Sequence, residues 1–171
     1  MFRLTRARAI VASFACALLL AACGTGREGR DDQAVSPALC QIPGPQSFAV
    51  FAETPPQVAA DLLSRFADVP TTESATGLAA RGGFYNGSYS RSTLLPNRRF
   101  VQALRRGNDV IVIYEHGGGP HLHVALYRQN ESGVYHAFAN VISGNNVHCE
   151  TAARVLANPR DPVLWHSRID W

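Results

Sequence analysis

The chain has 171 residues, enough for one domain with a sizeable core but too few for two stable domains of similar size. Its formal net charge is +3, from 16 basic and 13 acidic residues. Three of the basic residues, Arg3, Arg6 and Arg8, lie in an N-terminal segment with the features of a removable leader, so the remaining chain is near neutral. This balance argues against a general nucleic-acid-binding surface, and no nucleic acid partner is expected.

Residues 1–22 are predicted to be a signal peptide. An apolar run at residues 9–20 follows the arginines and is too short to span a membrane. It ends in Leu-Ala-Ala-Cys-Gly, with the cysteine at position 23, which resembles the lipobox of bacterial lipoproteins. The resemblance implies cleavage before Cys23 and acylation of that residue, which gives a stable lipid anchor in the membrane. Because Gly24 stands where lipoproteins retained in the inner membrane typically carry Asp, it also implies the periplasmic face of the outer membrane of a Gram-negative bacterium.

Residues 23–37 are predicted to be a flexible tether between lipid and domain, because they are polar, rich in glycine and without periodicity. Residues 38–171 are then predicted to form a single globular domain. Its two cysteines, Cys40 and Cys149, are an even pair in an oxidising compartment, which predicts a disulfide bond between the tether exit and the C-terminal helix. A catalytic thiol at Cys40 is the alternative, although the Asp-Cys motif of the cell-wall peptidases found among lipoproteins is missing there.

The first elements of the domain are a short strand at 47–52 and a helix. Thr54 is placed to cap this helix, Pro55 suits its first turn, and Gln57 completes the spacing of a capping box. Apolar residues then recur at helical spacing as far as Phe66, and Pro70 ends the run. The pattern predicts a helix that packs one face against the core.

Two tyrosines near a turn are candidates for a ligand or partner surface. The dipeptide Asn86-Gly87 between aromatic residues predicts a small hairpin within residues 84–89. Tyr85 and Tyr89 of this hairpin are suited to stack on a ligand such as a sugar. The interpretation that we favour is that both rings pack against the edge of the sheet.

A strand is predicted at 98–106, and Gly107-Asn108 forms a tight turn into the next strand. The strand carries arginines near both of its ends. We expect these to be solvated, and a patch that faces phosphates or cell-wall carboxylates is the alternative. The arginines are Arg98, Arg99, Arg105 and Arg106.

The strongest pattern in the chain is a hairpin between residues 111 and 127, with its turn at 117–120. Pairing across the turn places His116 opposite His121 and Tyr114 opposite His123. Because side chains alternate along a strand, one face of this hairpin should be core. That face collects Phe100, Leu104, Ile111, Ile113, Leu122, Val124 and Leu126, and the opposite face collects Val110, Val112, Tyr114, His116, His121, His123, Ala125 and Tyr127.

The histidines of the second face are candidate metal ligands. The His121-Leu-His123 spacing puts two imidazoles about 7 Å apart on one side of a strand, and a third from a neighbouring strand gives workable geometry for zinc or copper. A strand at 134–141, set with His136 opposite Ala125, would bring His136 to the same face. The alternatives are polar residues at the sheet rim, or a surface that hydrogen-bonds a ligand or partner. The metal candidates are His116, His121, His123 and His136, and Tyr114 and Tyr127 join them as candidates for the ligand surface.

The C-terminal part is predicted to contain a helix at about 147–157, capped by Asn145 or Asn146, and a last strand at 163–171. The helix carries an apolar stripe that includes Ala152 and Leu156, which should face the core. Alternation of apolar and polar residues in the last segment favours a strand added to the sheet.

The expected fold class is α+β: an antiparallel β-sheet, built as a meander of hairpins with roughly five to seven strands, packed against two α-helices on one face. The expected function is that of a lipid-anchored protein of the periplasmic face of the outer membrane. It would bind an envelope protein or a cell-wall component without catalysis and without a cofactor. The alternative is a zinc- or copper-binding protein, or a metal-dependent hydrolase or lyase, that uses the histidines of the central hairpin.

Overall fold

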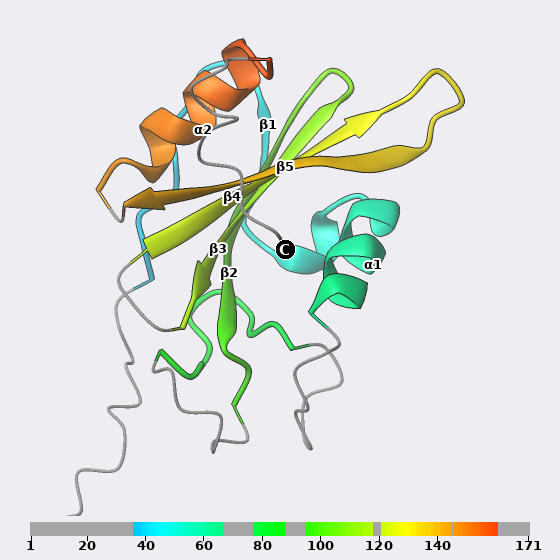
Figure 1. The fold of residues 1–171 in the computed structure, drawn as a ribbon. Coiled ribbons are helices and arrows are strands. Elements are labelled where there is room, and N and C mark those ends of the chain that lie inside the picture. Colours follow the sequence, from blue (N-terminus) through cyan, green and yellow to red (C-terminus); the bar gives the residue numbers. More distant parts are fainter. Residues whose placement is uncertain (1–35, 67–76, 88–94, 118–120, 145, 161–171) are drawn as a thin grey trace, which may run out of the picture.

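The fold was analysed in a computed structural model that describes residues 36–66, 77–87, 95–117, 121–144 and 146–160. These residues form a five-stranded antiparallel sheet with two α-helices, which confirms the predicted α+β class (Figure 1). The strands follow one another in chain order across the sheet. They are β1 (Gln46–Phe48), β2 (Arg98–Arg106), β3 (Asp109–His116), β4 (His121–Gln129) and β5 (Tyr135–Gly144), and the helices are η1 (Phe51–Glu53), α1 (Pro56–Arg65) and α2 (His148–Ala157).

The two predicted turns of the central strands set the register as expected. Gly107, at a φ of +57°, lies in the turn that pairs Arg106 with Asp109. Across the next hairpin, Tyr114 lies opposite His123. A left-handed conformation at Gly107 is one that glycine adopts without steric cost, and it allows β2 and β3 to join through two residues.

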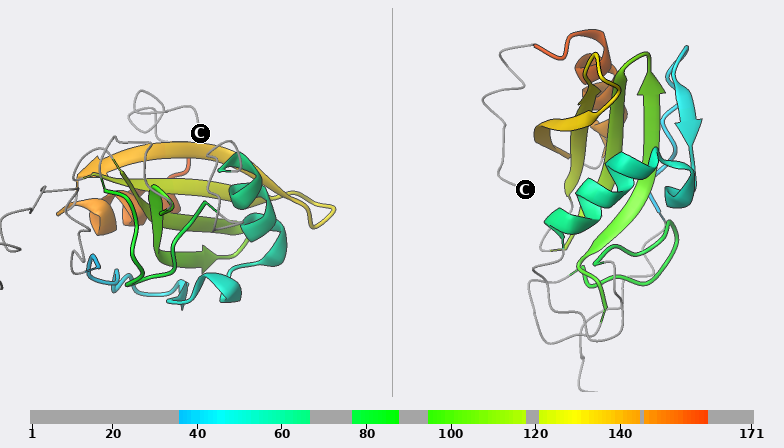
Figure 2. Two further views of the ribbon diagram at one scale, coloured as in Figure 1. Left: turned by 90° about the horizontal axis from the view of Figure 1, so that it is seen from below. Right: turned by 90° about the vertical axis from the view of Figure 1, so that its right-hand side faces the viewer.

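The two helices cover opposite faces of the sheet, so the prediction of both helices on one face is wrong. Figure 2 shows α1 on one side of the strands and α2 on the other. Both faces of β3 and β4 are apolar over most of their length, because valine, alanine and tyrosine occupy the face opposite the predicted core. Each face therefore needs a cover. The core under α2 includes Val101, Leu104, Ile111, Ile113, Leu122, Val124, Leu126, Ala152 and Val155, and the core under α1 includes Val58, Leu62, Phe66, Phe100, Val110, Val112, Tyr114, Ala125 and Tyr127.

A β-bulge in β2 overturns one assignment to a face. Phe100 pairs with Tyr114 and Gln102 pairs with Ile113, so the residue between them is an extra one. The bulge reverses the alternation, and Phe100 packs under α1 instead of sharing a face with Ile111. Leu104 lies beyond the bulge, opposite Ile111, and keeps its predicted side.

The register predicted for the last hairpin is wrong. His136 lies opposite Arg128, and Asn140 takes the place opposite Ala125. The turn is tighter than predicted because Asn130 closes it: its backbone N–H donates to Val134 O, and its Oδ1 accepts from the backbone N–H of the same Val134. A register shift between Leu126 and Tyr127 moves the remaining pairs by one further residue.

Both helices begin without the predicted side-chain caps. α1 has Pro55 at its N-cap position, and no side chain caps it. Gln57 Oε1 instead accepts from the backbone N–H of Tyr135, which ties α1 to β5 at 3.2 Å. α2 has Val147 at its N-cap position, again without a side-chain hydrogen bond. The predicted first strand is shorter than expected, since β1 ends at Phe48 and a 3₁₀ turn follows.

Several predictions concern residues outside the described part of the chain. These include the signal peptide and lipidation site at Cys23, the ligand candidate Tyr89, the helix cap at Asn145 and the strand at 163–171. Among the helices of the described ranges, none has the length and the apolar character needed to cross a membrane.

Candidate functional site

Three histidines meet where β3 and β4 end at the turn between them; we refer to His116, His121 and His123 as the histidine cluster. The ring centroids of His116 and His123 lie 5.3 Å apart, and those of His121 and His123 lie 6.0 Å apart. The regular pairing of β3 with β4 explains this, because it places these residues on the same face of adjacent strands. Three of the four histidines predicted as metal candidates, His116, His121 and His123, therefore lie close together.

His123 is the buried centre of the cluster. Its side chain has a residue exposure of 5%, and neither ring nitrogen has a hydrogen-bond partner among the described residues. Tyr114 stacks on the imidazole with centroids 4.9 Å apart and an interplanar angle of 19°. Asn140 Nδ2 donates to Tyr114 Oη at 3.1 Å, which holds this ring in place from β5. A buried imidazole without partners is costly, and a ligand is one way to satisfy it.

Two of the three histidines in the cluster, His116 and His123, are uncharged at pH 7. Burial lowers the pKa of His123 to about 4, and His116, His121 and Arg98 act in the same direction, whereas the nearby Asn140 amide, which is not in hydrogen-bond geometry with the ring, acts against them. Burial also lowers the pKa of His116 to about 4, with Arg98 and His121 as further causes. Neutral imidazoles carry the lone pair that a metal ion needs, so both residues are in the ligating state without a proton to displace.

These two pKa values predict a stability that depends on pH. The folded-state values lie near 4, below the usual 6.5 of an unfolded histidine, so the unfolded chain takes up protons first as the pH falls. Above pH 6.5 the two histidines therefore do not lower the free energy of unfolding. This free energy falls as the pH drops from 6.5 towards 4, and it levels off below that. We expect a loss of about 2–4 kcal/mol for the two groups together, measured by urea unfolding.

The matched variants for this measurement are His123→Leu and His136→Gln. Removal of His123 should reduce the pH-dependent loss to about half, since one of two similar contributions disappears. His136 lies elsewhere on the sheet, and its replacement should leave the profile as it is. A free energy of unfolding that stays flat between pH 6.5 and 4 would contradict the buried, neutral state of the cluster.

The remaining predicted site residues do not join the cluster. His136 is exposed and lies opposite Arg128, where its Nε2 is 3.0 Å from Asn130 Nδ2. Of the tyrosines predicted for a ligand or partner surface, the three in the described residues are buried; Tyr114 and Tyr127 lie in the core under α1. The exposures are 2% for Tyr114, 0% for Tyr127 and 8% for Tyr85.

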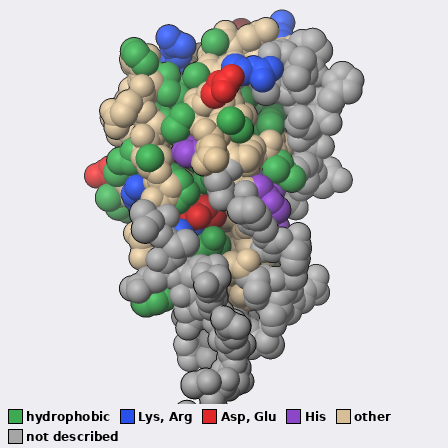
Figure 3. All heavy atoms as spheres, turned by 90° about the vertical axis from the view of Figure 1, so that its left-hand side faces the viewer, with side chains coloured by type: hydrophobic (Ala, Val, Ile, Leu, Met, Phe, Trp, Pro, Cys, Tyr) green, Lys and Arg blue, Asp and Glu red, His purple; other side chains and the backbone are tan. Residues whose placement is uncertain are grey.

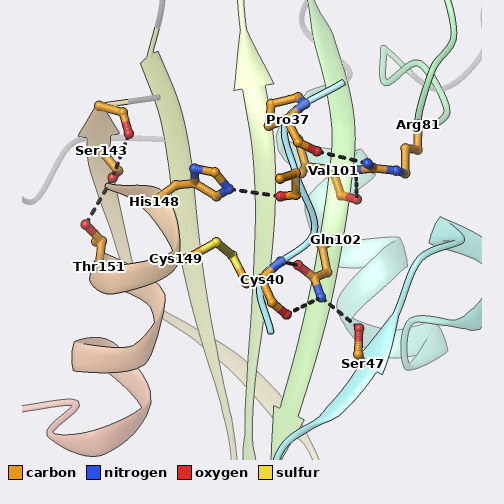
Figure 4. Close-up of a disulfide and its surroundings, with 12 residues drawn as sticks. Pro37, Cys40, Ser47, Arg81, Val101, Gln102, Ser143, His148, Cys149 and Thr151 are labelled. Carbon is orange, nitrogen blue, oxygen red and sulfur yellow. Dashed lines mark hydrogen bonds between the residues drawn. A yellow bond between two sulfur atoms is a disulfide. The ribbon is translucent and has the colours of Figure 1, made fainter. Parts of the chain in front are cut away.

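The predicted disulfide is confirmed by the Cys40–Cys149 bond, which has an S–S distance of 2.08 Å (Figure 4). Gln102 of β2 fixes the backbone of Cys40: its Oε1 accepts from Cys40 N at 2.7 Å, and its Nε2 donates to Cys40 O at 3.2 Å. His148 lies beside the sulfur atoms, with Nε2 3.2 Å from Ala38 O. Sequence reasoning missed His148, although its place next to Cys149 at a helix start was a usable signal.

The two groups of potential ligands differ in compactness. In the described ranges, one group of three metal-ligating side chains has all its ligand atoms within 4.8 Å of one another, and it consists of Cys40, His148 and Cys149. The histidine cluster is looser, so its nitrogens converge on one ion only after side-chain rotation. His116 and His121 are half-buried at the end of the hairpin, which leaves their side chains room to rotate.

Charged and histidine side chains are dispersed on the surface that lies over one side of the sheet. Figure 3 shows histidine side chains at separate places on this surface, and its acidic and basic side chains do not gather into a patch of one charge sign.

Comparison with known proteins adds no relative: no family model, no curated protein and no solved structure matches the chain.

Proposed function

We propose that this chain is a lipid-anchored binding protein of the periplasmic face of the outer membrane, and that the histidine cluster binds a transition-metal ion, Cu²⁺ or Zn²⁺. The observation that carries the proposal is the buried His123, which has no hydrogen-bond partner for either ring nitrogen among the described residues. The lipid anchor enters through the lipobox-like sequence that ends at Cys23.

The donor set supports these metals over hard cations. Imidazole nitrogen is a preferred ligand for copper and zinc, whereas magnesium and calcium take oxygen ligands. Three imidazoles leave one or more coordination positions for water or a small anion. Tyr114, stacked on His123 and held by Asn140, limits the orientations of the central imidazole and so favours one arrangement of the ligands.

The arrangement supports binding rather than catalysis. Glu115, next to His116 in the chain, lies on the opposite face of β3 and forms an ion pair with Arg99. Its carboxylate is therefore not available as a general base beside the cluster. The phenol of Tyr114 has a pKa raised to about 12, mainly by burial, and stays protonated at neutral pH.

Metal binding is tested on untagged protein with its disulfide intact. We expect about one equivalent of Cu²⁺ or Zn²⁺ by isothermal titration calorimetry and by elemental analysis, together with a rise in melting temperature on metal addition. His121→Gln should weaken binding by roughly 10-fold or more, because it removes one of three ligands while leaving the buried core intact. His136→Gln is the matched control and should bind like the wild-type protein. If neither metal binds at stoichiometric levels, the proposal fails.

Arg98 gives a further prediction about affinity. It pairs with His116 in the register of β2 and β3, its Cζ lies 4.2 Å from the centroid of the Phe66 ring, and its positive charge lowers the pKa of both His116 and His123. The same charge repels a bound dication. Arg98→Gln should therefore tighten metal binding by about 3- to 10-fold at low ionic strength, with less effect at high salt.

The control for this variant is Arg106→Gln, since Arg106 is exposed at the other end of β2. Titration calorimetry at two salt concentrations separates the charge effect from a change in packing, because only the former is screened. An affinity that falls in Arg98→Gln would show that the arginine supports the site through its contacts and would contradict the repulsion argument.

A further inference from the structure

A second group of metal-ligating atoms lies on the other face of the sheet, beneath α2. The sulfur atoms of Cys40 and Cys149 and a ring nitrogen of His148 all lie within 4.8 Å of one another. Cys40 comes from the segment before β1, and the other two residues open α2 (Figure 4). Two sulfur atoms and one imidazole form a donor set typical of zinc sites.

The surrounding contacts hold these residues in place independently of the disulfide. Cys40 has an exposure of 2% and is fixed by both hydrogen bonds of the Gln102 amide, whose Nε2 also donates to Ser47 Oγ at 2.7 Å. His148 is buried and held at the Ala38 carbonyl oxygen. α2 itself packs on the sheet through Ala152, Val155 and Leu156.

We propose that, in the reduced protein, Cys40, Cys149 and His148 bind Zn²⁺, so that the disulfide and a zinc ion are alternative occupants of one site. The zinc site is distinct from the histidine cluster, which lies on the α1 face, and it does not depend on the function proposed above. Cys149 is half-buried, which leaves a path from solvent for the ion and for a water molecule as fourth ligand.

Exchange between the disulfide form and the zinc-bound form is a two-electron step. A dithiol reductant transfers two electrons and two protons to the Cys40–Cys149 bond, the S–S bond breaks, and the reductant becomes a disulfide. Zn²⁺ then displaces the two thiol protons and forms two zinc–thiolate bonds and one bond to a ring nitrogen of His148. In the reverse direction a disulfide oxidant takes two electrons from the thiolates, the S–S bond re-forms and the zinc ion is released.

The position of Cys149 favours this chemistry. It is the second residue of α2, so a zinc ion bound there is held directly by the helix that packs on the sheet. An exported chain enters its compartment with reduced cysteines. Zinc at this site would join the segment before β1 to α2 before oxidation does.

The test uses the chain from residue 23 onward with Cys23→Ser, so that Cys40 and Cys149 are its only thiols. After reduction with a phosphine and removal of the reductant, the protein is titrated with Zn²⁺ against a chromophoric chelator and, separately, with Co²⁺. The background also carries His121→Gln, which weakens metal binding at the histidine cluster, and the oxidised protein of the same background measures what that cluster still binds. We expect about one equivalent of zinc more in the reduced protein than in the oxidised one, and thiolate-to-cobalt charge-transfer absorption in the reduced protein alone.

Two variants decide the ligand set. His148→Gln retains both thiols and should weaken zinc binding by roughly 10- to 100-fold. Cys40→Ser/Cys149→Ser should abolish it. If reduction unfolds the protein, zinc should restore the far-ultraviolet circular dichroism of the oxidised form. The proposal is overturned if reduced, folded protein retains no zinc, if zinc fails to refold an unfolded reduced chain, or if His148→Gln binds zinc as the parent does.

Discussion

Replacing Arg99 with leucine is expected to destabilise the protein by about 3–5 kcal/mol, because it leaves a carboxylate buried without its cation. The Arg99 side chain is 1% exposed and its Nε lies 2.5 Å from Glu115 Oε2. The guanidinium also lies 4.5 Å from the centroid of the Tyr85 ring, and Tyr85 Oη donates to Glu115 at 3.5 Å. This group joins β2, β3 and the segment 77–87, so its loss should loosen that segment first.

The double variant Arg99→Leu/Glu115→Leu separates the value of the ion pair from the cost of an orphaned charge. We expect it to recover most of the loss, since replacing both partners of a buried pair by apolar residues is often close to neutral. Arg105→Leu, on the exposed end of the same strand, should change the free energy of unfolding by no more than about 0.5 kcal/mol. Urea unfolding at pH 7 measures all three. A single Arg99 variant as stable as Arg105→Leu would contradict this account.

Arg99 also shows where sequence reasoning fails. Four arginines near the ends of one strand predicted solvated charges, and this is correct for Arg105 and Arg106, which are exposed. Arg98 and Arg99 are buried because the segment 77–87 and the end of α1 cover the other end of β2. The segment 77–87 has no periodic pattern, and the position of a segment over a strand end depends on long-range contacts. No local sequence pattern therefore predicts that these arginines are buried.

The central hairpins were predictable because two independent constraints agreed on them. The tight turn at Gly107 and the alternation of apolar residues both specify the register of β2, β3 and β4. The histidine cluster followed from that register alone. The bulge next to Phe100 inserts a residue, so the alternation counts wrongly there and the error on Phe100 follows. The error on His136 comes from the turn before β5, which is tighter than predicted and sets the pairing of His136 with Arg128.

The face of the sheet that carries the histidines was misjudged for a different reason. Its tyrosines and histidines were predicted to form a metal site or a ligand surface, but Tyr114, Tyr127 and His123 are all buried beneath or beside α1. Amphipathic side chains of this kind occur on either side of the core boundary, so their presence does not fix the direction of a face. The valines at 110 and 112 on the same face were the better signal of a second core.

Removal of the disulfide is the second large effect that we expect. Cys40 and Cys149 are 109 residues apart in sequence, so the bond closes most of the domain into one loop. In the chain-entropy model such a loop contributes about 4–5 kcal/mol, and losses of about 2–5 kcal/mol are usual for native disulfides. We therefore expect Cys40→Ala/Cys149→Ala to lose stability by about 2–5 kcal/mol in urea unfolding. The dependence of that free energy on urea should steepen, because an unfolded chain without the cross-link exposes more surface.

The contacts around the bond determine whether this loss is global or local. α2 keeps its apolar contacts through Ala152, Val155 and Leu156, and Gln102 keeps its hydrogen bonds to the backbone of residue 40, so the folded state should survive the substitution. Because the stabilisation acts mainly on the unfolded chain, hydrogen exchange should accelerate across the whole sheet and not in α2 alone. His148→Gln, which retains the disulfide, should leave that exchange nearly unchanged away from α2. Acceleration limited to α2 in the double alanine variant would mean that the bond acts as a local clamp on the helix, and the entropic account would then be wrong.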